Sequence, residues 1–186
     1  PGVYFSQEID KTSDKEVFIG KMIPGRGAWL EFDTDKRDTL GVRVDRKRRQ
    51  HITGFLMALD VIENKEDAIE LLGDYPSVRN TIERDPDTTR EAALIDLYRK
   101  LRPGEPATVE SARNLVKQMF YTPKRYDLTK VGRYKVEQKL GRQYGEKDAE
   151  SYTTEDDGML RIEDMIDSIK YVIALHAGED LSLIHI

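Results

Sequence analysis

Cysteine is missing altogether from this 186-residue sequence. Its absence excludes disulfide bonds, zinc sites built on thiolates and a cysteine nucleophile, and it agrees with a reducing, cytoplasmic location. Histidine is scarce: only His51, His176 and His185 occur, and none has a second ligand at metal-binding spacing. We therefore expect surface or structural histidines.

Long apolar runs and phosphate-binding loops are also missing. No stretch approaches the ~20 apolar residues of a transmembrane helix, so we expect no membrane partner. The glycines of Pro24-Gly25-Arg26-Gly27 are not followed by Lys-Ser/Thr. The acidic pairs Asp156-Asp157 and Glu163-Asp164 stand at expected helix starts, where they favour the helix dipole rather than acid–base work or magnesium binding. The sequence offers no catalytic constellation.

No excess of positive charge is present. The chain has 30 Lys and Arg against 35 Asp and Glu, a net charge of −5 and a pI near 5.4, so any role at nucleic acid requires local clustering. One cluster, here called the basic cluster, contains five cations within seven residues: Arg43, Arg46, Lys47, Arg48 and Arg49. Such a run can contact phosphates, although it is more often a solvated face.

The hydrophobic period changes near residue 50. Before it, short runs of period two indicate strands, and Leu40 to Val44 alternates an apolar face with Gly41 and Arg43. After it the period is helical. The expected helices are Asn64 to Leu72, Thr88 or Thr89 to Leu101, Thr108 to Phe120, Val131 to Leu140 and Ile162 to Leu175. This pattern predicts an α+β fold: antiparallel strands or a hairpin over residues 1–50, then a mainly helical part over residues 51–180.

Four strings together resemble bacterial DNA-directed RNA polymerase β subunits. They are PGVYF from Pro1, IPGRGAWLEFDTDKRDTLGVRVDRKRR from Ile23 to Arg49, ALIDLYRKLRPGEP from Ala93 to Pro106, and KRYDLTKVGRYKV from Lys124 to Val136. The resemblance runs to about Asp180. It implies the lobe of the β subunit, domain 2, which with the neighbouring protrusion forms one jaw of the DNA cleft.

The resemblance assigns roles to three residues. In the family, the Trp of RG-WL, the Asp of VR-D and the Arg of RPGEP help to form a pocket for a non-template-strand base; here these are Trp29, Asp45 and Arg102. A ring can stack on an unpaired base, a carboxylate can accept from the pairing edge of guanine, and a guanidinium can anchor base or phosphate. The family's other pocket members lie outside this chain, so we expect weak binding by the chain alone.

The function implied is that of one piece of a multisubunit nucleotidyltransferase. Its partners would be DNA, as non-template strand and downstream duplex, and the β′, α and σ subunits. We expect no cofactor in this piece, and a catalytic Mg²⁺ held by another subunit. The alternative is a free-standing protein-interaction or regulatory domain descended from the lobe, which the flanking gene sequence would distinguish.

The last six residues depart from the family pattern. Leu181 to Ile186 read LSLIHI, where the family continues with an acidic, histidine-containing loop. We expect a non-native tail, derived from a sequencing adaptor and without a structural partner.

Overall fold

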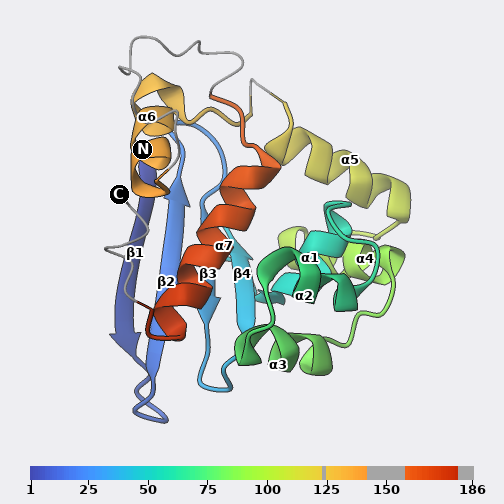
Figure 1. Ribbon diagram of the computed structural model, residues 1–186. Helices are drawn as coiled ribbons and strands as arrows, with labels where there is room; N and C mark the ends of the chain where they lie inside the picture. Colours follow the sequence, from blue (N-terminus) through green and yellow to red (C-terminus); the bar gives the residue numbers. More distant parts are fainter. Residues whose placement is uncertain (123–124, 142–157, 180–186) are drawn as a thin grey trace.

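The computed structural model describes residues 1–122, 125–141 and 158–179. Its first part is an antiparallel sheet in which each strand pairs with the next along the chain (Figure 1). The strands are β1 (Gly2–Ile9), β2 (Glu16–Ile23), β3 (Leu30–Thr34), β4 (Leu40–Val44) and β5 (Gln50–His51). The helices all follow the strands, which confirms the predicted α+β class.

Strand β4 shows how the period-two pattern becomes a two-faced sheet. Its alternate residues Leu40, Val42 and Val44 are buried in the core, while Arg43 is exposed on the other face. Gly41 is buried on that other face because the guanidinium of Arg49 lies directly over it, where a Cβ would overlap the guanidinium. The predicted alternation is confirmed. Arg49 can lie over the second face because Gly41 has no side chain.

Helices form in all five predicted segments, and two more in the described part, over Ile52–Ala58 and Pro76–Arg84, were not predicted. The described helices are α1 (Ile52–Ala58), the 3₁₀ helix η1 (Lys65–Asp67), α2 (Ala68–Leu72), α3 (Pro76–Arg84), α4 (Arg90–Leu101), α5 (Val109–Phe120), α6 (Thr129–Lys139) and α7 (Ile162–His176). The hydroxyls of Thr89 and Thr108 accept backbone N–H bonds at the starts of α4 and α5, as predicted.

One predicted helix is divided in two although both of its ends are as predicted, and one predicted helix starts earlier than expected. The segment from Asn64 to Leu72 is not one helix, because its first turn is the 3₁₀ helix η1; there Asp67 Oδ2 accepts the Asn64 N–H at 2.9 Å in a capping box. The helix predicted from Val131 starts at Thr129. The polar residues before Val131 carry no apolar period, so the pattern alone did not include them.

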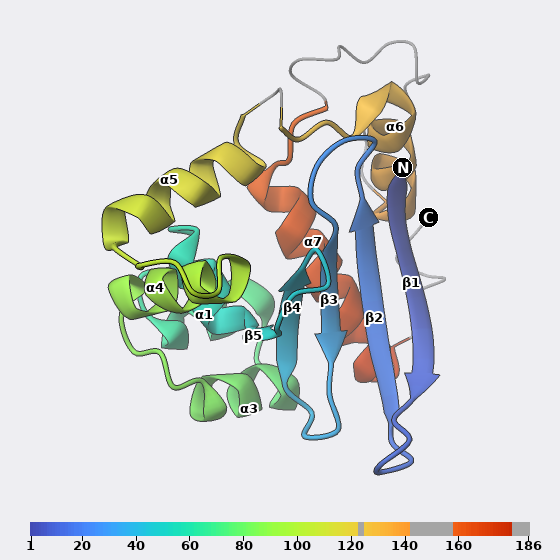
Figure 2. The same cartoon turned by 180° about the vertical axis from the view of Figure 1, so that it is seen from behind.

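Helix α7 crosses one face of the sheet, and Figure 2 shows the opposite face free of helices. Phe5 of β1 stacks on Tyr171 of α7 with ring centroids 3.8 Å apart. Helices α1, α4 and α5 lie beyond β4, and α6 lies beside β1. The buried apolar residues of strands and helices form one cluster, so the change near residue 50 is a change of secondary structure within a shared core.

A buried ion pair joins α6 to α7. Arg133 donates from Nη1 and Nη2 to the two carboxylate oxygens of Asp164, at 2.6 and 2.9 Å. It also donates from Nη1 to Glu137 at 3.2 Å and from Nη2 to the Met159 carbonyl at 2.6 Å. The three charged side chains are fully buried. Such a pair is costly to desolvate and still more costly to break, so removal of Arg133 should weaken the contact between α6 and α7.

Two predictions concern residues outside the described part: the non-native tail Leu181 to Ile186 and the acid pair Asp156-Asp157. Within the described part, no helix combines the length and the apolar character that a membrane crossing needs.

Candidate nucleic-acid interface

A tight turn after β4 presents the basic cluster. Asp45 and Arg46 both have positive φ, 50° and 59°, and the Lys47 N–H donates to the Val44 carbonyl at 2.9 Å. Positive φ at both central positions is the geometry of a type I′ turn, in which Asp is well tolerated and Arg is strained. The turn directs the side chains of Arg46 and Lys47 into solvent.

Asp45 ties this turn to the loop before β3. Its Oδ1 accepts the Trp29 N–H at 2.9 Å, and its own N–H donates to the Trp29 carbonyl at 2.9 Å. Among the described residues its carboxylate forms no ion pair with the neighbouring arginines. The indole of Trp29 is half-buried, with the Arg46 guanidinium 5.2 Å from the ring centroid.

Asp45 and Arg102 line one hollow of about 250 Å³. Arg102 reaches it from the end of α4, where its N–H donates to the Tyr98 carbonyl at 2.8 Å and ends the helix. The walls are completed by the loop before β3 and by α5. The structure therefore brings Asp45 to both other predicted residues: Trp29 by backbone contact and Arg102 across the hollow. The Trp29 ring itself is not part of the wall.

The loop before β3 is held close to the chain that follows α5. Arg26 and Asp127 exchange backbone hydrogen bonds at 3.0 and 2.8 Å. Gly27 has φ 120°, and a Cβ there would lie 2.7 Å from the Arg125 carbonyl oxygen, so this close approach requires glycine. Segments about a hundred residues apart in sequence thereby meet at the hollow.

Arg49 stands apart from the rest of the basic cluster. Its side chain is only 17% exposed, with Nε donating to Asp33 Oδ1 at 2.6 Å and Nη2 to the Thr39 carbonyl at 2.9 Å. Burial raises the pKa of Asp33, and the Arg49 charge opposes that shift. Arg49 is thus engaged in clamping the β3–β4 hairpin.

The other four cations face solvent. Arg46 is 72% exposed and lies 3.9 Å from Glu31 Oε1, and Arg43 lies 4.0 Å from Asp33 Oδ2. Lys47 and Arg48 are exposed. Contacts this long at a surface contribute little energy, so Arg43, Arg46, Lys47 and Arg48 can exchange them for phosphate oxygens.

Sequence reasoning missed two polar residues of the hollow, Arg125 and Gln118. Arg125 lies inside the string KRYDLTKVGRYKV, but nothing in its spacing connects it to Asp45. Gln118 is one of several polar residues on α5. Only the packing of α5 against the loops shows that both face Asp45.

The histidines in the described part have structural surroundings. His176 Nε2 lies 2.9 Å from Asp38 Oδ1 and so joins α7 to the β3–β4 turn. Burial lowers the pKa of His51. No group of three or more His, Asp or Glu side chains in the described ranges is arranged to hold a metal ion.

Comparison with known proteins adds a second line of evidence. Residues 1–179 match the family described as RNA polymerase Rpb2, domain 2. The chain is 54% identical over 179 residues to the DNA-directed RNA polymerase subunit beta of Streptomyces avermitilis, and 51% identical over 181 residues to that of Arthrobacter sp.. Each match covers 96% of this chain but only 14–15% of the relative's length.

Proposed function

Because the chain belongs to the RNA polymerase Rpb2 domain 2 family, we propose that it is the lobe of a bacterial polymerase β subunit and contacts DNA through the face described above. The chain spans about a seventh of the curated relatives it matches. RNA synthesis would therefore belong to the whole enzyme, and this piece would guide DNA.

The observation that carries this proposal is the convergence at Asp45. Its carboxylate lines a hollow with Arg102 and at the same time holds the backbone of Trp29. A hollow of about 250 Å³ lies slightly below the ~300 Å³ at which ligand pockets begin, which suits an incomplete base pocket. The second carboxylate oxygen and the Arg102 guanidinium would read the base edge, and the Trp29 ring would offer a stacking surface.

The exposed cations of the basic cluster would position the DNA backbone. Arg46, Lys47 and Arg48 are exposed, and they follow directly after Asp45, which lines the hollow. If about three cations contact single-strand phosphates, log affinity should fall with log salt at a slope near −2. Arg46→Glu/Lys47→Glu/Arg48→Glu should abolish that binding, whereas Lys11→Glu/Lys36→Glu/Arg37→Glu, a matched change on the two distant hairpin turns, should weaken it little. Equal loss of DNA binding in both triple variants would show that the basic cluster acts only through the net charge of the chain.

Base reading is tested in a polymerase assembled with this segment in its β subunit. Asp45→Asn keeps an oxygen for the Trp29 N–H and tolerates the positive φ, but it places an amide N–H donor where the second carboxylate oxygen would accept from the base edge. We expect this variant to lose about 1 to 3 kcal/mol of discrimination at one non-template position. The readout is open-complex lifetime on templates that differ only at that base.

Trp29→Ala provides the complementary result. Loss of stacking should remove about 1 to 3 kcal/mol of stabilisation from the open complex. The lifetime of the complex should therefore shorten by the same factor for every base. Lys11→Gln, far from the hollow on the β1–β2 turn, is the control. If base substitution affects Asp45→Asn and the parent enzyme equally, the residues around the hollow are structural and the proposed base site is wrong.

The remaining parts of the proposal concern the complete enzyme. The catalytic Mg²⁺ would be held by another subunit, as the resemblance to polymerase β subunits implies. The β′, α and σ subunits would be partners, and the cysteine-free composition agrees with a cytoplasmic enzyme.

A further inference from the structure

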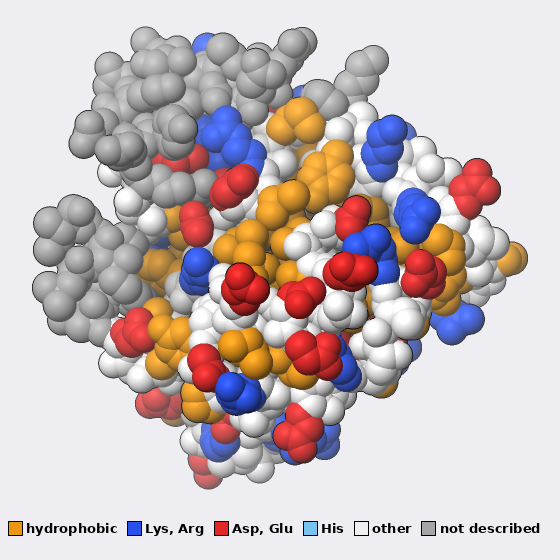
Figure 3. Space-filling view, turned by 45° about the vertical axis from the view of Figure 1, so that its right-hand side comes forward, with side chains coloured by type: hydrophobic (Ala, Val, Ile, Leu, Met, Phe, Trp, Pro, Cys, Tyr) orange, Lys and Arg blue, Asp and Glu red, His pale blue; other side chains and the backbone are white. Residues whose placement is uncertain are grey.

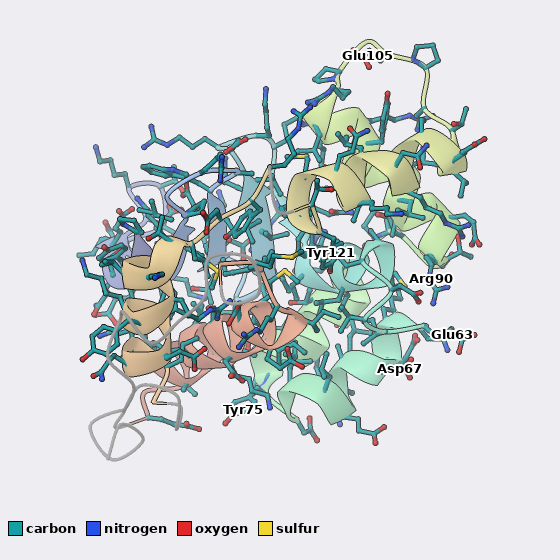
Figure 4. The ribbon with its side chains drawn as sticks, turned by 90° about the horizontal axis from the view of Figure 1, so that it is seen from above. Glu63, Asp67, Tyr75, Arg90, Glu105 and Tyr121 are labelled. Carbon is teal, nitrogen blue, oxygen red and sulfur yellow. The ribbon has the colours of Figure 1, made fainter. Side chains whose placement is uncertain are left out.

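A second hollow, of about 220 Å³, lies among the end of α1, the start of α4 and the outer side of α5. We call it the α5 hollow. Its charged lining residues are Arg90, Arg113, Lys117 and Asp60, and Tyr121 forms part of its wall. Figure 4 labels Arg90 at the start of α4 and Tyr121 after the end of α5.

Two hydrogen-bond donors at the α5 hollow lack an acceptor. Arg90 Nε and the Tyr121 hydroxyl are both buried, and neither has a hydrogen-bond partner in the described structure. Burial also raises the pKa of Tyr121, so its hydroxyl keeps its proton at neutral pH. A buried donor without an acceptor destabilises the folded protein. Two such donors beside one hollow indicate a place for an acceptor oxygen.

The charge at the α5 hollow is positive although the whole chain is acidic. Arg90 is paired with Asp60 at 2.6 Å, but Arg113 and Lys117 have no side-chain ion pair among the described residues. The residues lining the hollow therefore carry two uncompensated positive charges, in a chain of net charge −5. Figure 3 shows Lys and Arg side chains at the upper right of this face, with Asp and Glu side chains among them. The field favours an anion.

The α5 hollow is separate from the proposed DNA site. Arg113, Val116 and Lys117 lie on one side of α5, whereas Leu115, Gln118 and Met119 line the hollow of Asp45. At 100° per residue these two sets occupy opposite faces of the helix. DNA bound at Asp45 would therefore not reach the α5 hollow directly.

We propose that the α5 hollow binds a carboxylate side chain from an acidic segment of a protein partner. The Asp60 contact shows that a carboxylate fits against the Arg90 guanidinium. The walls between the cations are apolar, formed by Leu59, Leu94 and Val116. Apolar walls can pack against the apolar residues that flank an acidic residue in a peptide. A phosphate backbone offers them no such apolar partner. The volume admits one such side chain, not a nucleotide.

Access to the two donors requires movement of the rim. Arg113 and Lys117 are exposed, long and unpaired within the described part of the chain. Exposed side chains of this kind change rotamer within nanoseconds. When they swing outward, a carboxylate can enter between them, accept from Arg90 Nε and Tyr121 Oη, and keep both rim cations as salt-bridge partners.

Binding is measured by fluorescence anisotropy on the full 186-residue chain. The probe is a short fluorescein-labelled peptide that alternates glutamate and leucine, and a glutamine-for-glutamate version is the uncharged comparison. Arg113→Gln/Lys117→Gln should weaken peptide binding about tenfold. Tyr121→Phe keeps the ring and should weaken it about two- to tenfold through one lost hydrogen bond. The matched control is Lys11→Gln/Arg37→Gln on distant turns.

Several results would overturn the proposal. The parent chain is first checked for a helical circular dichroism spectrum. If the folded parent binds neither peptide, or binds both equally, the α5 hollow is not a carboxylate site. Equal loss in the control variant would mean that only net charge matters. If labelled oligothymidylate binding falls in Arg113→Gln/Lys117→Gln while glutamate peptide binding does not, the α5 hollow is a phosphate site and the assignment to protein is wrong.

Discussion

Replacing Arg133 by methionine should strongly destabilise the protein, because this cation is fully buried. The substitution keeps most of the side-chain volume but removes the hydrogen bonds of the guanidinium, among them two to Asp164 at 2.6 and 2.9 Å. Asp164 and Glu137, whose side chains are fully buried, would then lose the charge of Arg133. Breaking a buried pair in this way costs about 3 to 5 kcal/mol. Since domains have only about 5 to 15 kcal/mol of stability, the variant should be marginally stable.

Urea unfolding followed by circular dichroism measures this loss. The midpoint should fall while the slope against urea stays constant, because the surface exposed on unfolding is unchanged. In a thermal scan the midpoint should fall by roughly 10 °C for a chain of this size. Lys130→Met, an exposed cation on the same helix, is the matched control and should change stability by less than about 0.5 kcal/mol.

A compensated variant separates lost charge pairing from lost packing. Arg133→Met/Glu137→Met/Asp164→Asn removes the buried charges together and keeps an oxygen for the Arg161 N–H, which Asp164 accepts at 2.8 Å. Replacing a whole buried ion cluster by neutral groups is often neutral, so most of the stability should return. If Arg133→Met instead costs no more than Lys130→Met, the cluster does not hold α6 and the reasoning fails.

Three further predictions concern the sheet and its surroundings. Asp45→Ala should cost about 1 to 3 kcal/mol in urea unfolding, because it loses the Trp29 N–H bond and places alanine at positive φ, whereas Asp45→Asn should cost little; equal costs would refute the turn geometry. Gly41→Ala should displace the Arg49 guanidinium and cost about 1 to 3 kcal/mol, but almost nothing in an Arg49→Ala background, as a double-mutant cycle would show. Burial and the Asp96 carboxylate raise the pKa of Asp87 to about 7, so the folded chain binds more protons than the unfolded chain between about pH 4 and 7 and this carboxyl lowers stability as pH rises. Asp87→Asn should therefore gain stability relative to the parent as pH rises from about 4 to about 7, and the difference should stay constant above that; a pH-independent difference would contradict the shift.

The sequence was sufficient for the features that depend on neighbours along the chain. The alternation of Leu40, Val42 and Val44 determines which face of β4 is buried, and the threonines before α4 and α5 mark where those helices begin. The strings that resemble polymerase β subunits led to the family, which the match over residues 1–179 confirmed. Local hydrogen bonding and side-chain period act within a few residues, so they can be read without the fold.

Tertiary structure decided which charged residues are available and which are engaged. Arg43 to Arg49 look alike in the sequence, yet only the β3–β4 pairing puts Arg49 over Gly41 and against Asp33. The partnership of Arg133 with Asp164 crosses thirty-one residues and has no periodic signature. A charge is exposed or buried according to what the rest of the chain packs against it, and that packing arises from contacts distant in sequence. For the same reason the hollow shared by Asp45 and Arg102, and the unsatisfied donors beside α5, exist only in the folded chain.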